Sequence, residues 1–149
     1  MNISNSFSIS ASALTAQRLR MDVISSNIAN AETTRAQVVD GKAVPYRRKM
    51  VVMAPMKTEF GQVLDSAMGK TQASRGVKVT EIKEDASEFK PVYNPTHPDA
   101  DSEGYVYMPN VDILKEMVDA ISATRSYEAN VTALNASKAM ITKALQIGK

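Results

Sequence analysis

The segment after Pro109 is predicted to form one uninterrupted helix from about Asn110 to Ile147, and this feature constrains the fold most. Pro109 blocks extension of the helix upstream, Asn110 is expected to cap its N-terminus, and Asp112 complements the helix dipole. At 1.5 Å per residue, such a helix would be about 55 Å long. Because that length exceeds the usual range for a compact domain, it indicates a coiled coil or an assembly.

Apolar residues recur along this segment at helical spacing, and a polar stretch divides them into two groups. The apolar residues are Leu114, Met117, Val118 and Ile121, followed by Val131, Leu134, Ile141 and Leu145. Residues 124–130, between the groups, are polar almost all round, which the core of a monomer does not need. A polar insert in a helix seam is best known as a device that fixes register or partner. We therefore expect the polar stretch to act in assembly.

An amphipathic helix is also predicted near the N-terminus, from about Ser6 to Ala31. Its apolar positions are Phe7, Leu14, Met21 and Ile28, with Ala11, Ile24 and Ala31 on intermediate turns. The chain has 5% aromatic residues, no Trp and nine Met, a composition that suits helix seams better than a thick sandwich. We expect the two terminal helices to pair as a coiled coil.

Residues 36–108 are predicted to form a small, irregular, β-rich middle segment. Its expected features are a two-residue hairpin turn at Asp40-Gly41, a strand over Met50–Met53, a second strand opened by Gly76 with Val77 and Val79 on one face, a turn over Asn94–Pro98, and a mobile stretch near Ser66–Arg75. The fold class is thus mainly α, divided into residues 1–35, 36–108 and 109–149.

Charge and composition exclude several classes of function. The net charge of +2 is balanced along the chain, whereas nucleic-acid binders concentrate a basic face. The absence of cysteine excludes disulfides and thiolate metal sites. The first basic residue is Arg18 and no apolar h-region precedes it, so no cleavable signal peptide is expected. No stretch approaches the ~20 apolar residues of a membrane-spanning helix.

Two sets of motifs stand near opposite ends of the chain. The first is Ser26-Asn27-Ile28-Ala29-Asn30 with Thr33-Thr34, and the second is Asn110-Val111-Asp112, Glu116-Met117-Val118 and Arg125-Ser126-Tyr127-Glu128-Ala129-Asn130. Together they resemble the terminal signatures of flagellar rod and hook proteins. Further motifs are similar to those of the proximal rod members: Pro45-Tyr46-Arg47-Arg48-Lys49, the turn from Pro95 to Asp101 with Gly104-Tyr105-Val106, and Met108-Pro109-Asn110-Val111. The resemblance covers nearly the whole chain except about Ala54–Arg75.

The resemblance implies a non-catalytic structural subunit of the basal-body rod. Such proteins leave the cell uncleaved through the flagellar type III export apparatus and stack helically through their terminal helices, forming a torque-transmitting drive shaft and export channel. The implied partners are other copies, other proximal rod proteins, the export-gate adaptor at the rod base and the distal rod protein, with no nucleic acid, small-molecule substrate, cofactor or metal. The expected interface residues are Leu14, Met21, Asn27, Ile28, Asn30, Leu114, Met117, Ile121, Arg125, Tyr127, Glu128, Asn130, Leu134 and Ile141.

Other functions have weaker support in the sequence. A hydrolase would need a nucleophile, a base and an orienting group, and the single histidine, His97, lies in the predicted turn. Asp99, Asp101 and Glu103 with Gly104 imitate the start of a calcium loop, but position 12 falls on Asn110, where a bidentate Glu is required. The basic run 47–49 is typical of a solvated or sheet-edge face. The main alternative is a generic coiled-coil adaptor.

Overall fold

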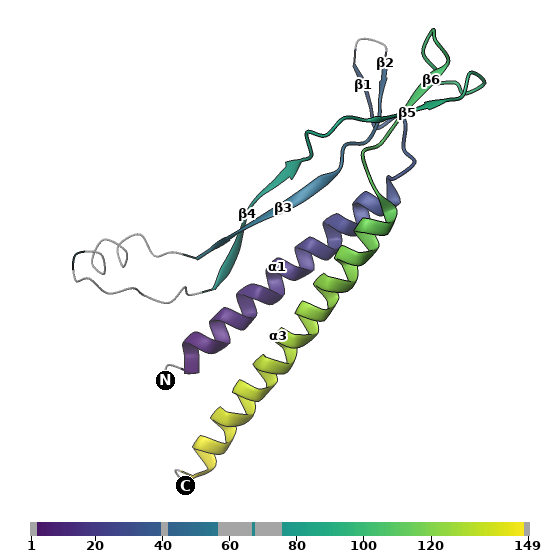
Figure 1. Ribbon diagram of the computed structural model, residues 1–149. Coiled ribbons are helices and arrows are strands. Elements are labelled where there is room, and N and C mark those ends of the chain that lie inside the picture. The colour runs from purple at the N-terminus through teal and green to yellow at the C-terminus, as the bar shows by residue number, and fades with distance from the viewer. Residues whose placement is uncertain (1–2, 40–41, 57–66, 68–75, 148–149) are drawn as a thin grey trace. The chain divides into compact units, whose positions relative to one another are not determined.

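The computed structural model describes residues 3–39, 42–56, 67 and 76–147. A helix stands at each end of the chain, and three two-stranded sheets lie between the helices in sequence (Figure 1). The elements are α1 (Ile3–Ala29), β1 (Gln37–Val39), β2 (Lys42–Val44), β3 (Lys49–Pro55), β4 (Val77–Glu84), β5 (Lys90–Tyr93), β6 (Tyr105–Met108) and α3 (Ile113–Ile147). The strands pair as β1-β2, β3-β4 and β5-β6. The expectation of two long terminal helices around a β-rich middle is therefore confirmed.

The chain forms two compact units, and each helix contributes to both. Unit 1 contains residues 1–19, 52–81 and 123–149, and unit 2 contains residues 20–51 and 82–122. Among the described residues, the buried apolar ones include Ala16 and Ala123 in unit 1 and Val23, Ile24, Tyr46, Val106 and Val111 in unit 2. The two buried apolar residues described in unit 1 are both alanines.

Two of the predicted strand features are confirmed. In the first sheet Val39 pairs with Lys42, which leaves two residues between the strands, as a two-residue hairpin requires. Asp40 and Gly41 themselves lie outside the described residues. In β4, Val77 and Val79 are half-buried while their neighbours Lys78 and Thr80 are exposed, so the two valines share one face.

Other boundaries differ from the prediction. The strand predicted over Met50–Met53 is longer in the structure and covers the whole of β3. The predicted turn over residues 94–98 is present. The stretch near Ser66–Arg75 lies outside the described residues except for Ala67. Helix α1 ends at Ala29, two residues earlier than predicted, and the side chain of the next residue, Asn30, donates a 2.9 Å hydrogen bond to the Ser26 carbonyl.

The predicted cap of the C-terminal helix is wrong. Helix α3 begins at Ile113, and Asp112 caps it, since Asp112 Oδ1 accepts hydrogen bonds from the N–H groups of Leu114 and Lys115 at 3.1 and 3.4 Å. Asn110 is buried, and its side chain binds the middle segment instead: Arg48 N–H donates to Asn110 Oδ1 at 2.8 Å. The prediction therefore had a suitable type of capping residue, but it placed the cap two positions too early in the chain.

Gly76 allows β4 to approach α1 closely. Its φ of +131° favours glycine, and an added Cβ would lie 2.4 Å from Ser12 Oγ. That hydroxyl donates to the Ile9 carbonyl at 2.7 Å and accepts from Val77 N–H at 3.1 Å, so it cannot move aside without losing two hydrogen bonds.

Gly76→Ala is therefore expected to lower the free energy of unfolding by about 1–3 kcal/mol, measured by urea denaturation. The control introduces Gly76→Ala into the Ser12→Ala variant, where the clashing hydroxyl is absent but the backbone strain remains. In that background Gly76→Ala should lower the free energy of unfolding by less than it does in the wild type. Wild-type stability of Gly76→Ala would show that the close approach does not hold in solution.

Candidate functional site

Asn27, in the last turns of α1, is buried and fully hydrogen-bonded. Its Nδ2 donates to the Lys49 carbonyl at 2.8 Å and to Glu116 Oε2 at 2.9 Å. Its Oδ1 accepts from Lys49 N–H and from the Tyr46 hydroxyl, both at 3.0 Å. Both donors and both acceptor sites of the amide are thus used. The side chain of Asn27 consequently links α1, β3 and α3.

Glu116, in the first turns of α3, is the buried carboxylate that completes this link. Its side chain is 1% exposed, and its second oxygen accepts a hydrogen bond from Arg48 Nε at 2.7 Å and lies 2.6 Å from Arg48 Nη2. Arg48 also lies 3.4 Å from Asp85 and 3.8 Å from Asp119. Burial opposes the charge of Arg48, but Glu116 and then Asp85 outweigh it, so the pKa of Arg48 is raised above its ordinary value.

Asn110 attaches the segment before α3 to the same place. Its Oδ1 accepts from Arg48 N–H, and its Nδ2 donates to the Asp85 carbonyl at 3.2 Å and to Ser87 Oγ at 2.9 Å. We call the group formed by Asn27, Tyr46, Arg48, Asn110 and Glu116 the helix-joining cluster. It ties the end of α1, the segment around residues 46–49 and the start of α3 into one hydrogen-bonded network.

A second contact joins the two helices on the solvent side. Arg20 Nη2 donates to Asp119 Oδ1 at 3.1 Å, with both side chains about a third exposed. Arg20 pairs with Asp119, and Asn27, which is later in α1, pairs with Glu116, which is earlier in α3. The two helices therefore run antiparallel within unit 2.

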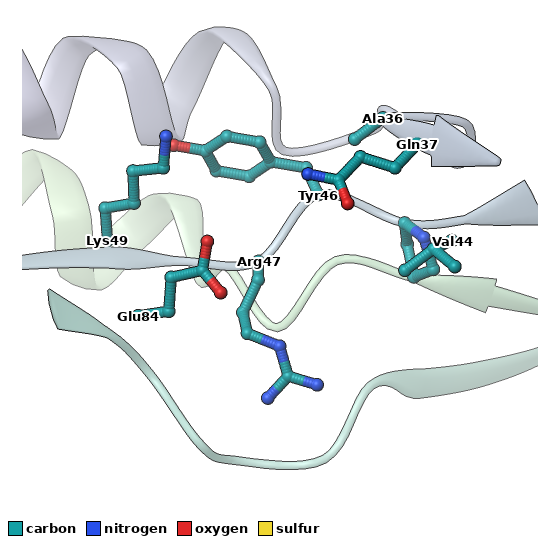
Figure 2. Close-up of a pocket in the computed structure, with 8 residues that line it drawn as sticks. Ala36, Gln37, Val44, Tyr46, Arg47, Lys49 and Glu84 are labelled. Atoms are coloured by element: carbon teal, nitrogen blue, oxygen red, sulfur yellow. The ribbon is translucent and has the colours of Figure 1, made fainter. Parts of the chain in front are cut away.

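A small hollow lies beside the helix-joining cluster and shares Tyr46 with it. It has a volume of about 110 Å³ and is lined by Ala36, Gln37, Val44, Pro45, Tyr46, Arg47, Lys49 and Glu84 (Figure 2). Lys49 Nζ lies 5.7 Å from the centroid of the Tyr46 ring, and Arg47 Cζ lies 4.6 Å from that of Phe89. Its basic residues thus contact aromatic rings of the same unit. Among the residues that the structure describes, no group of three His, Cys, Asp or Glu could hold a metal ion.

In the turn that resembles the start of a calcium loop, Asp99 forms hydrogen bonds with other residues of the same chain. Asp99 accepts hydrogen bonds from Thr34 Oγ1 at 2.9 Å and from Arg35 Nε at 3.0 Å, and its side chain is 8% exposed. These two partners, Arg35 first, hold the pKa of Asp99 below its ordinary value. In the same unit, hydrogen bonds from Ser87 and then Arg48 lower the pKa of Asp85.

Acid is expected to destabilise unit 2 for this reason. A carboxyl group whose pKa is lower in the folded state contributes stability that is complete above its unfolded pKa and is lost as the pH falls through the folded pKa. The loss should begin as the pH falls below about 4, the ordinary value for Asp. Urea denaturation across this range would measure it, and Asp85→Asn, which cannot titrate, should show the smaller fall. An equal fall in both proteins would exclude Asp85 as a contributor.

The buried and exposed sides of α3 are opposite faces of the helix. One set of buried and half-buried residues recurs every three or four positions, and we call it the inner row: Glu116, Ala120, Ala123, Tyr127, Asn130, Leu134, Ser137 and Ile141; Asp119, Ser126 and Val131 beside it are also half-buried. The apolar residues of the first turns point the other way, and we call them the outer stripe: Leu114, Met117, Val118 and Ile121, which are 76, 50, 67 and 61% exposed. At about 100° per residue, Glu116 and Ala123 lie roughly half a turn from Leu114.

This arrangement corrects the reading of α3 as two groups on one apolar stripe. Leu134 and Ile141 belong to the inner row, whereas Leu114 and Ile121 belong to the outer stripe. The polar residues 124–130 do not interrupt the inner row either, because Tyr127 and Asn130 continue it.

The remaining expected interface residues lie at different depths. Leu14, Met21 and Ile28 on α1 and Asn30 just after it are half-buried, whereas Arg125 and Glu128 are exposed and form an ion pair of 3.5 Å. The structure brings Asn27 into the helix-joining cluster. Its partners Tyr46, Arg48, Asn110 and Glu116 stood in the quoted motifs, but nothing in the sequence indicated that they meet.

Family models match both ends of the chain. One described as "Flagella basal body rod protein" matches residues 7–37, and one described as "Flagellar basal body rod FlgEFG protein C-terminal" matches residues 102–147. Asn27 lies in the first match and Glu116 in the second, so the two matched segments meet in the helix-joining cluster.

Full-length relatives agree with these matches. The chain is 61% identical to the flagellar basal-body rod protein FlgC of Bacillus subtilis, and 44% identical to that of Salmonella typhimurium, over 100% of both chains in each case. It is 44% identical to the FlgC of Borreliella burgdorferi, over 99% of this chain and 98% of that one. Among the described residues, no helix is long and apolar enough to cross a membrane.

Proposed function

This chain belongs to the family of flagellar basal-body rod proteins and is a structural subunit of that rod, and we propose that it polymerises helically through its terminal helices. The predicted resemblance to this family is thereby confirmed. Polymerisation would build a drive shaft that transmits torque and encloses an export channel. In this proposal the chain has no catalytic role.

The observation that carries the proposal is the exposure of the outer stripe. Leu114 and Val118 are 76 and 67% exposed, although they stand on a long helix whose opposite face is buried. Adjacent exposed apolar residues on one face mark a surface that another protein covers. A rod made of stacked subunits supplies such a cover from neighbouring copies. A helical stack needs two different patches on each subunit, because a contact between identical patches closes into a dimer.

The helix-joining cluster supports the same proposal from inside the subunit. It links α1 to α3 through Asn27 and Glu116, so a load applied to either helix is shared by both in unit 2. We further propose that the helices continue this pairing as a coiled coil. In this arrangement residues 1–35 and 109–149 are the two assembly helices, and residues 36–108 are the middle segment. The inner row supports the coiled coil, since its spacing of three and four residues is the coiled-coil pattern.

The partners that fit this role are other copies, other proximal rod proteins, the export-gate adaptor at the rod base and the distal rod protein. We also propose export through the flagellar type III apparatus without cleavage of a signal peptide. Nucleic acid and small-molecule substrates have no place in this function. A generic coiled-coil adaptor has weaker support, because the relatives that match this chain over 98–100% of their length are rod proteins.

The proposal can be tested at the exposed ion pair between Arg125 and Glu128. Their side chains are 79 and 59% exposed, and such a pair contributes about 0–1 kcal/mol to the stability of a monomer. Arg125→Ala and Glu128→Ala should therefore leave the circular dichroism and melting of the purified subunit unchanged, but should reduce the yield of assembled basal bodies. Equal losses in both measurements would indicate an intramolecular role, and normal yields would remove this surface from the proposed interface.

A further inference from the structure

We propose that the buried ion pair between Glu116 and Arg48 selects the register of α3 against α1 and β3, and that it adds specificity to the fold rather than stability. The inference rests on the proposed function only for its motility readout. The register itself can be measured on the isolated subunit.

The packing of α3 specifies its register weakly. The positions of the inner row repeat every seven residues. Several of these positions carry small side chains, among them Ala120, Ala123 and Ser137. Among the described residues, the buried side chains of α1 are also small or medium-sized: Ser10, Ala16, Val23, Ile24 and Asn27. A shift by seven residues would move α3 by about 10.5 Å and keep the same side of the helix inward.

The polar contacts distinguish the registers strongly. Glu116 is the one charged residue of the inner row, and its two oxygens have different partners, Asn27 from α1 and Arg48 from the segment that begins β3. A seven-residue shift would put Ala123 in the place of Glu116 and Ser126 in the place of Asp119. Arg48 would then lose both carboxylates of α3 while remaining in a buried position. A buried charge without its partner is strongly unfavourable.

The same pair need not stabilise the native register over the unfolded chain. Removing a guanidinium and a carboxylate from water costs about as much as their attraction returns, so an apolar pair of similar size is often neutral or stabilising. Removing only one partner leaves the other buried and unpaired. Single and double substitutions should therefore behave differently, and this difference separates selection of a register from simple stabilisation.

The variants are Glu116→Leu, Arg48→Met and the double variant Arg48→Met/Glu116→Leu in the full chain. Each single variant should melt about 10 °C or more below the wild type, whereas the double variant should stay within about 5 °C of it. Register is read by thiol cross-linking, because the chain contains no cysteine. Arg20→Cys with Asp119→Cys reports the native register, and Arg20→Cys with Ser126→Cys reports the shifted one.

With Glu116 and Arg48 intact, a short thiol cross-linker should join only the native pair. In the double variant, the cross-linking yield of the Arg20→Cys with Ser126→Cys pair should rise by about tenfold or more, and motility should be lost although the protein is folded. A folded double variant that cross-links only in the native register would overturn the inference, as would an unfolded one. Loss of motility with an unchanged cross-linking pattern would also overturn it, since another effect would then be responsible.

Discussion

Replacing Glu116 by Ala is expected to lower the free energy of unfolding by about 3–5 kcal/mol, the usual cost of removing one partner from a buried ion pair. Glu116 is 1% exposed and accepts hydrogen bonds from Arg48 and Asn27. Its loss leaves the guanidinium of Arg48, 14% exposed, with only the longer contacts to Asp85 and Asp119. The amide of Asn27 loses one acceptor as well. Urea denaturation of the purified subunit would measure the change.

Glu128→Ala is the matched control for this prediction. Glu128 stands on the same helix and also pairs with an arginine, Arg125, but both side chains are mostly exposed. Its replacement should change the unfolding free energy by less than about 1 kcal/mol. If the two variants were equally stable, the helix-joining cluster would not be formed in the isolated protein.

The sequence predicted those features whose causes lie within a few residues. The pairing of β1 with β2 across a gap of two residues follows from local sequence, and the shared face of Val77 and Val79 follows from strand alternation. The start of α3 also has a local cause, but that cause is the cap at Asp112 before Ile113 rather than the proline at position 109.

The features that the sequence did not reveal depend on distant partners. Asn110 has the right residue type for a helix cap, but its amide is drawn away by Arg48 N–H and by Asp85 and Ser87. Glu116 would ordinarily be placed on a solvated face, since carboxylates are rarely buried without a partner. Only the fold brings Arg48, 68 residues earlier in the chain, within 2.7 Å of it.

The two faces of α3 show the same limit. Periodicity identified apolar residues at helical spacing, but it could not decide which face packs within the subunit. The face with more large apolar residues in the first turns, from Leu114 to Ile121, is the exposed one. The buried face has Glu116 and Ala123 instead, and the hydrogen-bond partners of Glu116 offset the burial of its charge there. In a subunit that polymerises, the greater hydrophobicity can belong to the surface between copies.

Leu114→Asp should consequently abolish rod assembly and motility while leaving the subunit folded. Leu114 is 76% exposed, so a carboxylate at this position stays hydrated in the monomer and should change its unfolding free energy by about 0.5 kcal/mol or less. In the assembled rod the outer stripe would be covered, and an unpaired charge would be buried there at a cost of several kcal/mol. Every subunit of a polymer carries the substitution, so the cost recurs at each step of growth. Motility in soft agar and basal-body yield would measure the loss.

Two comparisons make this last result specific to the outer stripe. Leu114→Met keeps an apolar side chain of similar size and should support near-normal motility. Ile121→Asp, two turns further along the same stripe and 61% exposed, should reproduce the defect of Leu114→Asp. Circular dichroism of the purified variants establishes that each is folded. Because the exposed side chains contribute little to the monomer, a folded variant without assembly places their function between subunits; normal motility of both Asp variants would exclude the outer stripe from the interface.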